Sequence, residues 1–200
     1  MDCSAAIRLA TAKDSARLLE IYGPFIENTA VSFEYAVPEE AEFKKRIDTV
    51  LKKLPWLVCE MDGEITGYAY ASEHKARAAY DWSADTSVYV DPAHHGRRIG
   101  TALYTALFDL LRFQGYINAY AGITQPNDKS NGLHASFGFV PVGVYHHVGY
   151  KLGAWHDVKR LELALAEPPA KPAAPKTINE IKGTEAFARI VERASAMVKA

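Results

Sequence analysis

The stretch 86–114 constrains the fold most, because it joins a short apolar strand to a long amphipathic helix through a basic loop that contains glycine. The strand is expected over 86–90 and the helix over 99–114. Four leucines fall on one face of this helix: Leu103, Leu107, Leu110 and Leu111. Backbone N–H groups at a helix start lack intrahelical partners and carry partial positive charge, so they bind anions such as phosphates. The sequence therefore predicts an α/β fold with an anion-binding turn after this strand.

Short strands and helices alternate along the remaining chain. Strands are expected over 7–10, 56–61, 64–71, 117–123, 140–148 and 159–165, and further helices from 11 to about 26, from 38 onwards and over 128–137. Asp62 and Gly63 separate two of the strands and tolerate positive φ, which predicts an antiparallel hairpin. Pro38, followed by Glu39 and Glu40, is typical of a first helical turn. This order predicts a mixed α/β domain.

Charge and cysteine content exclude several classes of protein. The 200 residues carry a formal net charge of −1 and no long basic block, so neither nucleic acid nor an acidic membrane is an expected partner. Cys3 and Cys59 have no metal-ligand or disulfide spacing. The histidine pairs 94–95 and 146–147 lack a third ligand, so no metal is expected. The sequence shows no signal peptide and no apolar run of ~20 residues, which favours a cytoplasmic protein acting on small molecules.

Proline and alanine dominate 167–177, which predicts an extended linker after a domain that spans 1–166. An amphipathic helix is expected within 178–200. Its apolar stripe comprises Phe187, Ile190, Val191, Ala194, Met197 and Val198. The sequence leaves open whether this stripe packs on the domain, on a partner or on nothing stable.

The turn after 86–90 resembles the coenzyme A signature of the GNAT superfamily of N-acetyltransferases, which runs Gln/Arg-x-x-Gly-x-Gly/Ala into a helix. His95 stands at the Gln/Arg position and Arg98 at the first glycine, while Gly100 matches. The loop can donate its amides to a pyrophosphate as long as Arg98 does not need positive φ. Four more segments resemble the phosphinothricin acetyltransferase branch: 29–34, 77–82, 125–139 and 148–158. The resemblance covers residues 7 to about 165.

The resemblance implies a mixed, largely antiparallel twisted sheet flanked by helices, with central strands splayed to admit a pantetheine arm. It also implies acetyl-CoA as cosubstrate, direct transfer in a ternary complex, and a homodimer. The cofactor-binding residues would be Val88, Tyr89, Val90, His95, Gly96, Arg97, Arg98, Ile99, Gly100, Thr101, Asn127 and Ser130. A backbone amide of the strand that carries Tyr89 and Val90 would contact the acetyl oxygen.

Acyl transfer from a thioester to an amine needs a base for the amine and an acid for the thiolate. The resemblance implies that Asp85, where this branch usually carries glutamate, is the base, and its shorter side chain implies a relaying water. A solvated loop acid is the alternative reading. His134 stands where many relatives place a tyrosine that protonates the thiolate, and a packed helix residue is its alternative. Asn127 is expected to contact the pantetheine or phosphate arm, and also reads as a turn residue.

An amino-acid acceptor needs cationic or hydrogen-bonding groups for its carboxylate. Lys75, Arg77 and Tyr80 lie upstream of Asp85 and of the strand expected over 86–90, and Arg77 is the first candidate. Phe33 and Glu34 lie in the loop between the first two helices and are expected either to close the substrate pocket or to anchor the loop.

The sequence thus predicts an N-acetyltransferase that moves acetyl from acetyl-CoA to the α-amine of a small amino-acid-like substrate such as phosphinothricin. The nearest alternative is an enzyme for methionine sulfoximine, methionine sulfone or a broader range of L-amino acids. The alternative from another class is a non-catalytic coenzyme-A-binding regulatory protein, motivated by Arg98 and by Asp85 in place of glutamate. A third alternative gives 178–200 a partner-binding role.

Overall fold

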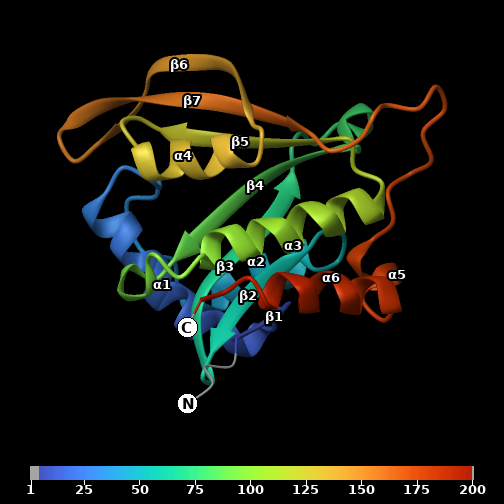
Figure 1. The fold of residues 1–200 in the computed structure, drawn as a ribbon. Coiled ribbons are helices and arrows are strands. Elements are labelled where there is room, and N and C mark those ends of the chain that lie inside the picture. Colours follow the sequence, from blue (N-terminus) through green and yellow to red (C-terminus); the bar gives the residue numbers. More distant parts are fainter. Residues whose placement is uncertain (1–4, 200) are drawn as a thin grey trace.

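A seven-stranded sheet forms the centre of the molecule, and helices cover both of its faces (Figure 1). The computed structural model describes residues 5–199, so Cys3 lies outside the described residues. The strands are β1 (Ala5–Leu9), β2 (Trp56–Met61), β3 (Glu64–Glu73), β4 (Ser83–Val90), β5 (Asn118–Thr124), β6 (Val140–Lys151) and β7 (Ala154–Ala164). Their order is β1-β2-β3-β4-β5-β7-β6, and every neighbouring pair is antiparallel except β4 and β5. The predicted mixed, mostly antiparallel sheet is confirmed.

Helices pack on both faces and divide the apolar core into two clusters. The helices are α1 (Ser15–Asn28), α2 (Glu40–Val50), α3 (Ile99–Gln114), α4 (Asp128–Ser136), α5 (Ile178–Ile181) and α6 (Glu185–Ser195), with short 3-10 turns at Ala12–Asp14, Ala78–Tyr80 and Pro92–His94. α1 and α2 cover one face, where Leu18 and Ile47 belong to the same buried cluster as Trp56. α3 and α6 cover the other face, where Leu107 and Ala194 are fully buried.

Alternation along each strand explains why both clusters form. In β2, Val58 belongs to the cluster under α1 and α2, whereas Leu57 and Cys59 belong to the cluster under α3. Successive strand side chains point to opposite faces, so a strand covered on both sides must be apolar at nearly every position. The apolar run at 56–59 therefore marks a central, doubly covered strand.

The two central strands β4 and β5 separate soon after they begin. Their parallel register joins 83–85 to 118–120 and ends at the pair Asp85↔Tyr120. β4 continues to Val90 while it remains paired with β3. From Thr86 onwards β4 thus has one edge bonded to β3 and one edge turned toward the gap, which is the splay that the resemblance implied.

The C-terminal segment crosses back over the domain, with α6 beside α3 and β1 (Figure 1). The indole N–H of Trp82 donates to the carbonyl oxygen of Ala173 at 2.8 Å, which ties down the proline-rich stretch. The backbone N–H of Ile7 donates to Ser195 Oγ at 2.8 Å. The apolar stripe of α6 joins the core under α3. Of the three arrangements that the sequence leaves open, the structure shows packing on the same chain.

Most predicted elements agree with the structure, and most differences lie at their ends. In 178–200, two helices, α5 and α6, stand where one was predicted, because the chain turns at 182–184. The helix after Pro38 begins at Glu40, with Glu39 as its N-cap residue. The last two strands are longer than the sequence predicts, because β6 and β7 pair along their length as a hairpin, interrupted by register shifts, that continues to the turn at 152–153. Helix α3 ends at Gly115, which adopts φ of 100° as a helix-terminating glycine does.

Candidate active site

The open edge of β4 lines a cavity of about 550 Å³ that also touches α1, α3 and α4. All of the predicted cofactor-binding residues except Arg97 line this cavity. Five further residues complete its wall: Phe25, Val31, His94, Lys129 and Leu133. An extended ligand with amide groups can pair with an open strand edge as another strand would, so the cavity suits a pantetheine-like arm.

The turn at the mouth of this cavity has an unusual backbone. Gly96 has φ of 85°, and Arg98, the residue that caps α3, has φ of 62° and ψ of 15°. The condition set for this loop from the sequence, that Arg98 does not need positive φ, is not met. A left-handed conformation costs a non-glycine residue roughly 1–2 kcal/mol, so this turn carries local strain. The first N–H groups of α3 nevertheless lie at the cavity, as an anion site requires.

Asn127 and His134 have the structural roles that were their alternative readings in the sequence, a turn residue and a packed helix residue. Asn127 Oδ1 accepts a hydrogen bond from the N–H of Ser130 at 3.1 Å and so caps α4, while the residue also lines the cavity. His134 is only 3% exposed. Its Nδ1 lies 2.7 Å from the carbonyl oxygen of Ser130, so Nδ1 carries the proton, and Nε2 lies 3.1 Å from the hydroxyl of Tyr104. Both ring nitrogens therefore have partners inside the protein.

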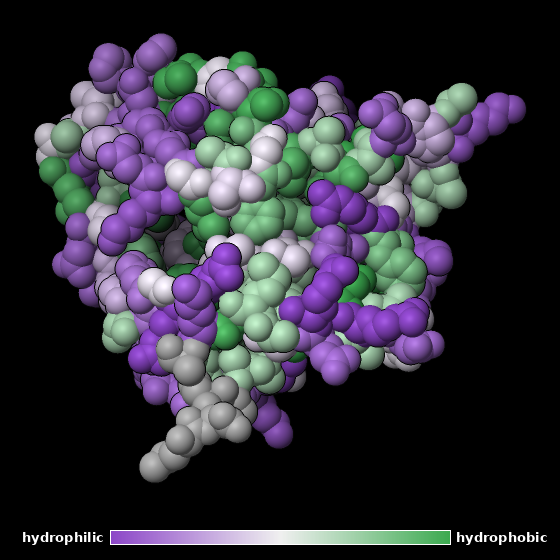
Figure 2. All heavy atoms as spheres, in the orientation of Figure 1, coloured by the Kyte–Doolittle hydropathy of each residue, from purple (hydrophilic) through white to green (hydrophobic). Residues whose placement is uncertain are grey.

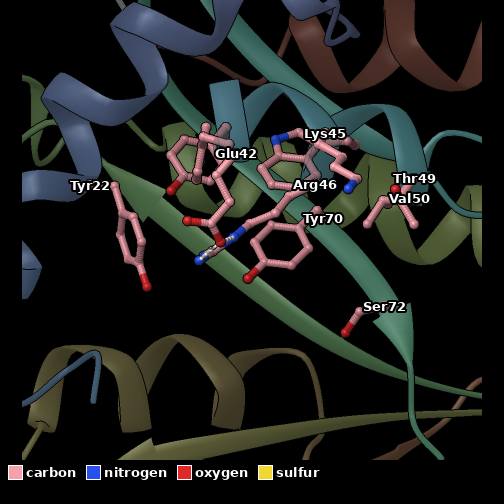
Figure 3. A pocket seen from close by; sticks show the side chains of 11 residues that line it. Tyr22, Glu42, Lys45, Arg46, Thr49, Val50, Tyr70 and Ser72 are labelled. Carbon is pink, nitrogen blue, oxygen red and sulfur yellow. Dashed lines mark hydrogen bonds and ion pairs between the residues drawn. The ribbon is translucent and has the colours of Figure 1, made fainter. Parts of the chain in front are cut away.

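A second cavity, of about 490 Å³, lies on the α1 and α2 side of the sheet (Figure 3). Aromatic side chains form much of its wall: Tyr22, Phe43, Trp56, Tyr68 and Tyr70. The rings of Trp56 and Tyr70 stack with centroids 4.2 Å apart. The indole N–H of Trp56 is buried and has no hydrogen-bond partner within residues 5–199. The cavity is thus mainly apolar and offers one buried donor.

Charged groups stand at the rim of the aromatic cavity. Arg46 donates to Glu34 Oε1 at 2.7 Å and to Glu42 Oε1 at 2.6 Å, and Lys45 lies beside it (Figure 3). The hydroxyl of Tyr22 lies 2.7 Å from Ser32 Oγ. Burial raises the pKa of Tyr22 to about 12, so this hydroxyl remains protonated at neutral pH. The rim thus combines a neutral hydroxyl group and an arginine that is paired with two carboxylates.

The aromatic cavity ends on β3 opposite the predicted catalytic carboxylate. Ser72 and Tyr70 both line the cavity, and their register partners on β4 are Asp85 and Ser87. Directly opposite residues of an antiparallel pair point to the same face, so Asp85 stands on the aromatic-cavity side of the sheet. The 550 Å³ cavity is lined by Val88, Tyr89 and Val90, which follow Asp85 on the same strand, so the two cavities lie on neighbouring strands.

Asp85 has two side-chain partners that the sequence does not reveal. Its Oδ1 accepts from Arg160 Nη2 at 2.7 Å, and its Oδ2 lies 3.2 Å from His74 Nδ1. Arg160 belongs to β7, and it reaches Asp85 only because of the order of the strands in the sheet, which no local sequence pattern predicts. In the sequence, only its position directly before Lys75, a predicted substrate residue, could have pointed to His74 as part of the site.

The predicted substrate residues occupy two exposed regions and line neither cavity. Lys75, Arg77 and Tyr80 lie between β3 and β4 and are exposed. Glu34 is held by Arg46 at the rim of the aromatic cavity. Phe33 lies against Gly149, where no side chain would fit. The structure thus brings Glu34 to the rim of the aromatic cavity. It also adds candidate residues that the sequence did not predict: Tyr22, Arg46, Tyr70 and Ser72.

Residues 5–199 contain no group of three or more His, Cys, Asp or Glu side chains that could hold a metal ion. Cys59 is buried and free, and burial raises its thiol pKa, so it is a poor nucleophile. In the part of the chain that the structure describes, no helix is both long and apolar enough to cross a bilayer.

Comparison with known proteins agrees with this geometry. Residues 7–159 match the model of the acetyltransferase (GNAT) domain family. A phosphinothricin N-acetyltransferase of Streptomyces viridochromogenes is 38% identical over 86% of this chain and 94% of its own length. An L-methionine sulfoximine/L-methionine sulfone acetyltransferase of Salmonella typhimurium is 33% identical over 80% of this chain and 95% of its own length.

Solved structures resemble the fold over the same region. The GNAT superfamily phosphinothricin acetyltransferase of Sinorhizobium meliloti, in complex with acetyl-CoA, superposes with a TM-score of 0.81 at 32% identity, covering 85% of this chain and 94% of that one. A protein of Salmonella typhimurium described as a putative acetyltransferase with its cofactor acetyl-CoA gives a TM-score of 0.81 at 32% identity, over 86% of this chain and 99% of that one.

Proposed function

Since the chain belongs to the GNAT acetyltransferase family, we propose that it transfers the acetyl group of acetyl-CoA to the α-amine of a small amino-acid-like acceptor such as phosphinothricin. One observation carries the proposal: residues 88–90 of β4 line one cavity of molecular size, and the β3 residues that line the other, Tyr70 and Ser72, pair with the preceding part of β4. A donor on the open edge and an acceptor on the aromatic side can then react directly in a ternary complex.

The residues of the 550 Å³ cavity suit acetyl-CoA. The turn at 95–101 would hold the pyrophosphate through backbone N–H groups, with the positive charge of Arg98 nearby. The open edge at Val88 and Val90 would bind the pantetheine amides, and a backbone N–H of this edge would polarise the acetyl carbonyl. Bound in this way, acetyl-CoA supplies an activated acetyl group at β4.

The acceptor would bind on the aromatic-cavity side of the sheet. We assign its carboxylate to Arg77 and Lys75 and its side chain to the aromatic cavity. Phe33 and Glu34, in the loop between α1 and α2, would close the substrate pocket. Asp85 and its hydrogen-bond partners supply the base. Because both nitrogens of His134 are already bonded inside the protein, we assign it to positioning Tyr104 and α4 rather than to protonating the thiolate.

The experiment that tests this function is thiol release from acetyl-CoA by the purified protein with four sets of acceptors. Phosphinothricin, methionine sulfoximine, methionine sulfone and the common L-amino acids are each supplied at the same concentration. Release above the no-acceptor rate with phosphinothricin supports the proposal, and faster release with a methionine derivative would move the acceptor to that class. Binding of acetyl-CoA without release in any set would overturn the enzyme and leave a coenzyme-A-binding protein.

We further propose a homodimer formed through the outer face of β6 and β7, within the cytoplasm. Apolar side chains gather on this hairpin, at the top and left edge of Figure 2: Val140, Val142, Val144, Tyr145, Val148, Tyr150, Leu152 and Trp155. An exposed apolar surface of this kind usually marks an interface. Val142→Glu should convert the dimer to a monomer in light scattering, whereas an unchanged mass would overturn this interface.

We retain the division into an acetyltransferase domain at 1–166, a linker at 167–177 and a C-terminal helical segment at 178–200. The hydrogen bonds of Trp82 to Ala173 and of Ile7 to Ser195 support treating the last segment as a brace for the domain. Light scattering of a chain that ends at Ala166 tests the alternative: an unchanged oligomeric state would argue against a partner-binding role.

A further inference from the structure

Both oxygens of Asp85 are already engaged by other side chains. Oδ1 accepts from the guanidinium of Arg160 at 2.7 Å, and Oδ2 faces His74 Nδ1 at 3.2 Å. The carboxylate is about one-third exposed, and the two partners are more buried. A carboxylate oxygen can accept more than one hydrogen bond, so Asp85 is not blocked, but a substrate amine would compete with both partners for it. The imidazole of His74 offers a second acceptor beside this carboxylate.

His74 is held in one tautomer and one orientation. An ionised carboxylate only accepts hydrogen bonds, so the proton of the neutral imidazole sits on Nδ1 and Nε2 keeps its lone pair. The ring stacks on Tyr120 with centroids 4.3 Å apart and planes 19° apart. Tyr80 adds an edge contact at 6.1 Å. A base that is oriented by a third group in this way has the arrangement that acyl-transfer enzymes use repeatedly.

His74 lies close in the chain to the residues assigned to the acceptor carboxylate. It directly precedes Lys75 and lies three residues before Arg77, the residues assigned to the acceptor carboxylate. Its partner Asp85 is the last residue of β4 that pairs with β5, so the pair stands where the splay opens. In an amino acid the carboxylate and the α-amine share one carbon, so an acceptor held by Lys75 and Arg77 brings its amine to this corner.

We infer that His74 Nε2 takes the proton from the acceptor ammonium, and that Asp85 is the positioning residue that fixes His74. This inference rests on the proposed function. The shorter side chain at position 85 leaves room for an imidazole where a water relay was expected. Arg160 in turn holds the carboxylate from β7.

The proton balance of the step is simple. His74 Nε2 removes one proton from the ammonium group, and the neutral amine attacks the thioester carbonyl carbon. The C–N bond forms and the C–S bond breaks, the second amine proton goes to the departing thiolate, and His74 returns its proton to solvent. One proton is released for each acetyl group transferred, and no other reactant is needed.

The pH dependence of the rate should report on His74. The groups around it are Asp85 of β4, Arg160 of β7 behind that carboxylate, Tyr120 of β5 with its hydrogen-bonded neighbour Glu162, and Tyr80. The wild-type rate should rise with pH and then level, as it does in an enzyme that needs a deprotonated base.

The test compares the wild-type protein with His74→Asn, whose side-chain N–H can still donate to Asp85 but which has no basic nitrogen. With an acceptor used by the wild type, kcat should fall by about 10²–10⁴-fold while the KM for acetyl-CoA stays the same. The residual rate should keep rising with pH, because only pre-existing neutral amine reacts. Glu73→Gln, which changes the preceding exposed residue, should retain the wild-type rate and profile.

A double-mutant comparison separates a relay from a purely structural role. If Asp85 acts through His74, the pair Asp85→Asn with His74→Asn should be about as slow as the slower single variant. His74→Ala should regain part of its rate when imidazole is added, which a packing defect would not do. A wild-type kcat in His74→Asn, or multiplicative losses in the double variant, would overturn the inference. Silence of the wild type with every acceptor would instead overturn the proposed function, and this inference with it.

Discussion

The backbone N–H of Lys199 donates a hydrogen bond to the carbonyl oxygen of Arg97 at 2.9 Å. The penultimate residue of the chain therefore holds the turn that would bind the pyrophosphate of acetyl-CoA. Arg97 is also the one predicted cofactor-binding residue that does not line the cavity. The carbonyl of Arg97 faces the C-terminal segment instead, so this segment is directly bonded to the turn at 95–101.

Removing the last two residues should loosen this turn without unfolding the protein. A hydrogen bond contributes about 1 kcal/mol net, so the Kd for acetyl-CoA should rise several-fold in calorimetry. A chain that ends at Ala166 should in addition lose thermal stability, because Ile178, Ile181 and Ala194 are buried in the core. Equal affinity in the wild type and the shorter truncation would show that the Lys199 contact does not act on the turn.

Substitutions of Arg98 should separate backbone strain from charge. Arg98→Gly and Arg98→Ala both remove the guanidinium at the cavity, and both should weaken acetyl-CoA binding. Only glycine tolerates φ of 62° without a steric penalty, so Arg98→Gly should be more stable than Arg98→Ala by about 1 kcal/mol in urea unfolding. Equal stability of the two variants would mean that the turn relaxes to another conformation.

Gly149→Ala should disturb the acceptor side of the enzyme. A Cβ at this position would collide with the ring of Phe33, which must then move together with the loop after α1. The expected results are a higher KM for the acceptor, an unchanged Kd for acetyl-CoA, and a stability loss of roughly 1–3 kcal/mol. Gly143→Ala is the matched control on the same strand, because a Cβ there meets open space. Unchanged acceptor KM in Gly149→Ala would remove Phe33 from the pocket.

The stability of the protein should fall in mild acid through His134. Burial lowers the pKa of His134, and the carbonyl of Ser130 opposes this only in part. As the pH falls below about 6.5, the unfolded chain takes up a proton at this residue before the folded protein does. This contribution to stability is thus complete at neutral pH and is lost as the pH falls from there through the folded pKa.

The variant His134→Gln should therefore show a weaker dependence of the unfolding free energy on pH between 7.5 and 5. Urea unfolding at several pH values measures this, with the wild type as reference for the other histidines. If both proteins lose stability equally, His134 does not titrate in this way. The same variant should retain kcat within about tenfold, since a catalytic acid at this position would lose about 10²–10⁴-fold.

Local patterns were sufficient wherever a single element decides the conformation. The helical spacing of four leucines predicted α3. Gly115 ends this helix because a residue in the left-handed conformation closes its last turn. Asp62 and Gly63 predicted the β2–β3 hairpin for the same kind of reason. The residues of the 550 Å³ cavity could also be predicted, since most of them lie in one continuous stretch from β4 into α3.

Tertiary structure alone decided the contacts that join distant segments. Arg160 reaches Asp85 because β5 stands between β4 and β7 in the sheet, and Lys199 reaches Arg97 because α6 packs beside α3 and β1. Backbone conformation at one residue reflects its near neighbours in the chain, whereas these contacts depend on how whole elements are ordered in space. The sequence by itself therefore determined the elements, the family and most residues of the 550 Å³ cavity. The structure decided the surroundings of Asp85 and the aromatic cavity, since strands and helices far apart in the chain build both.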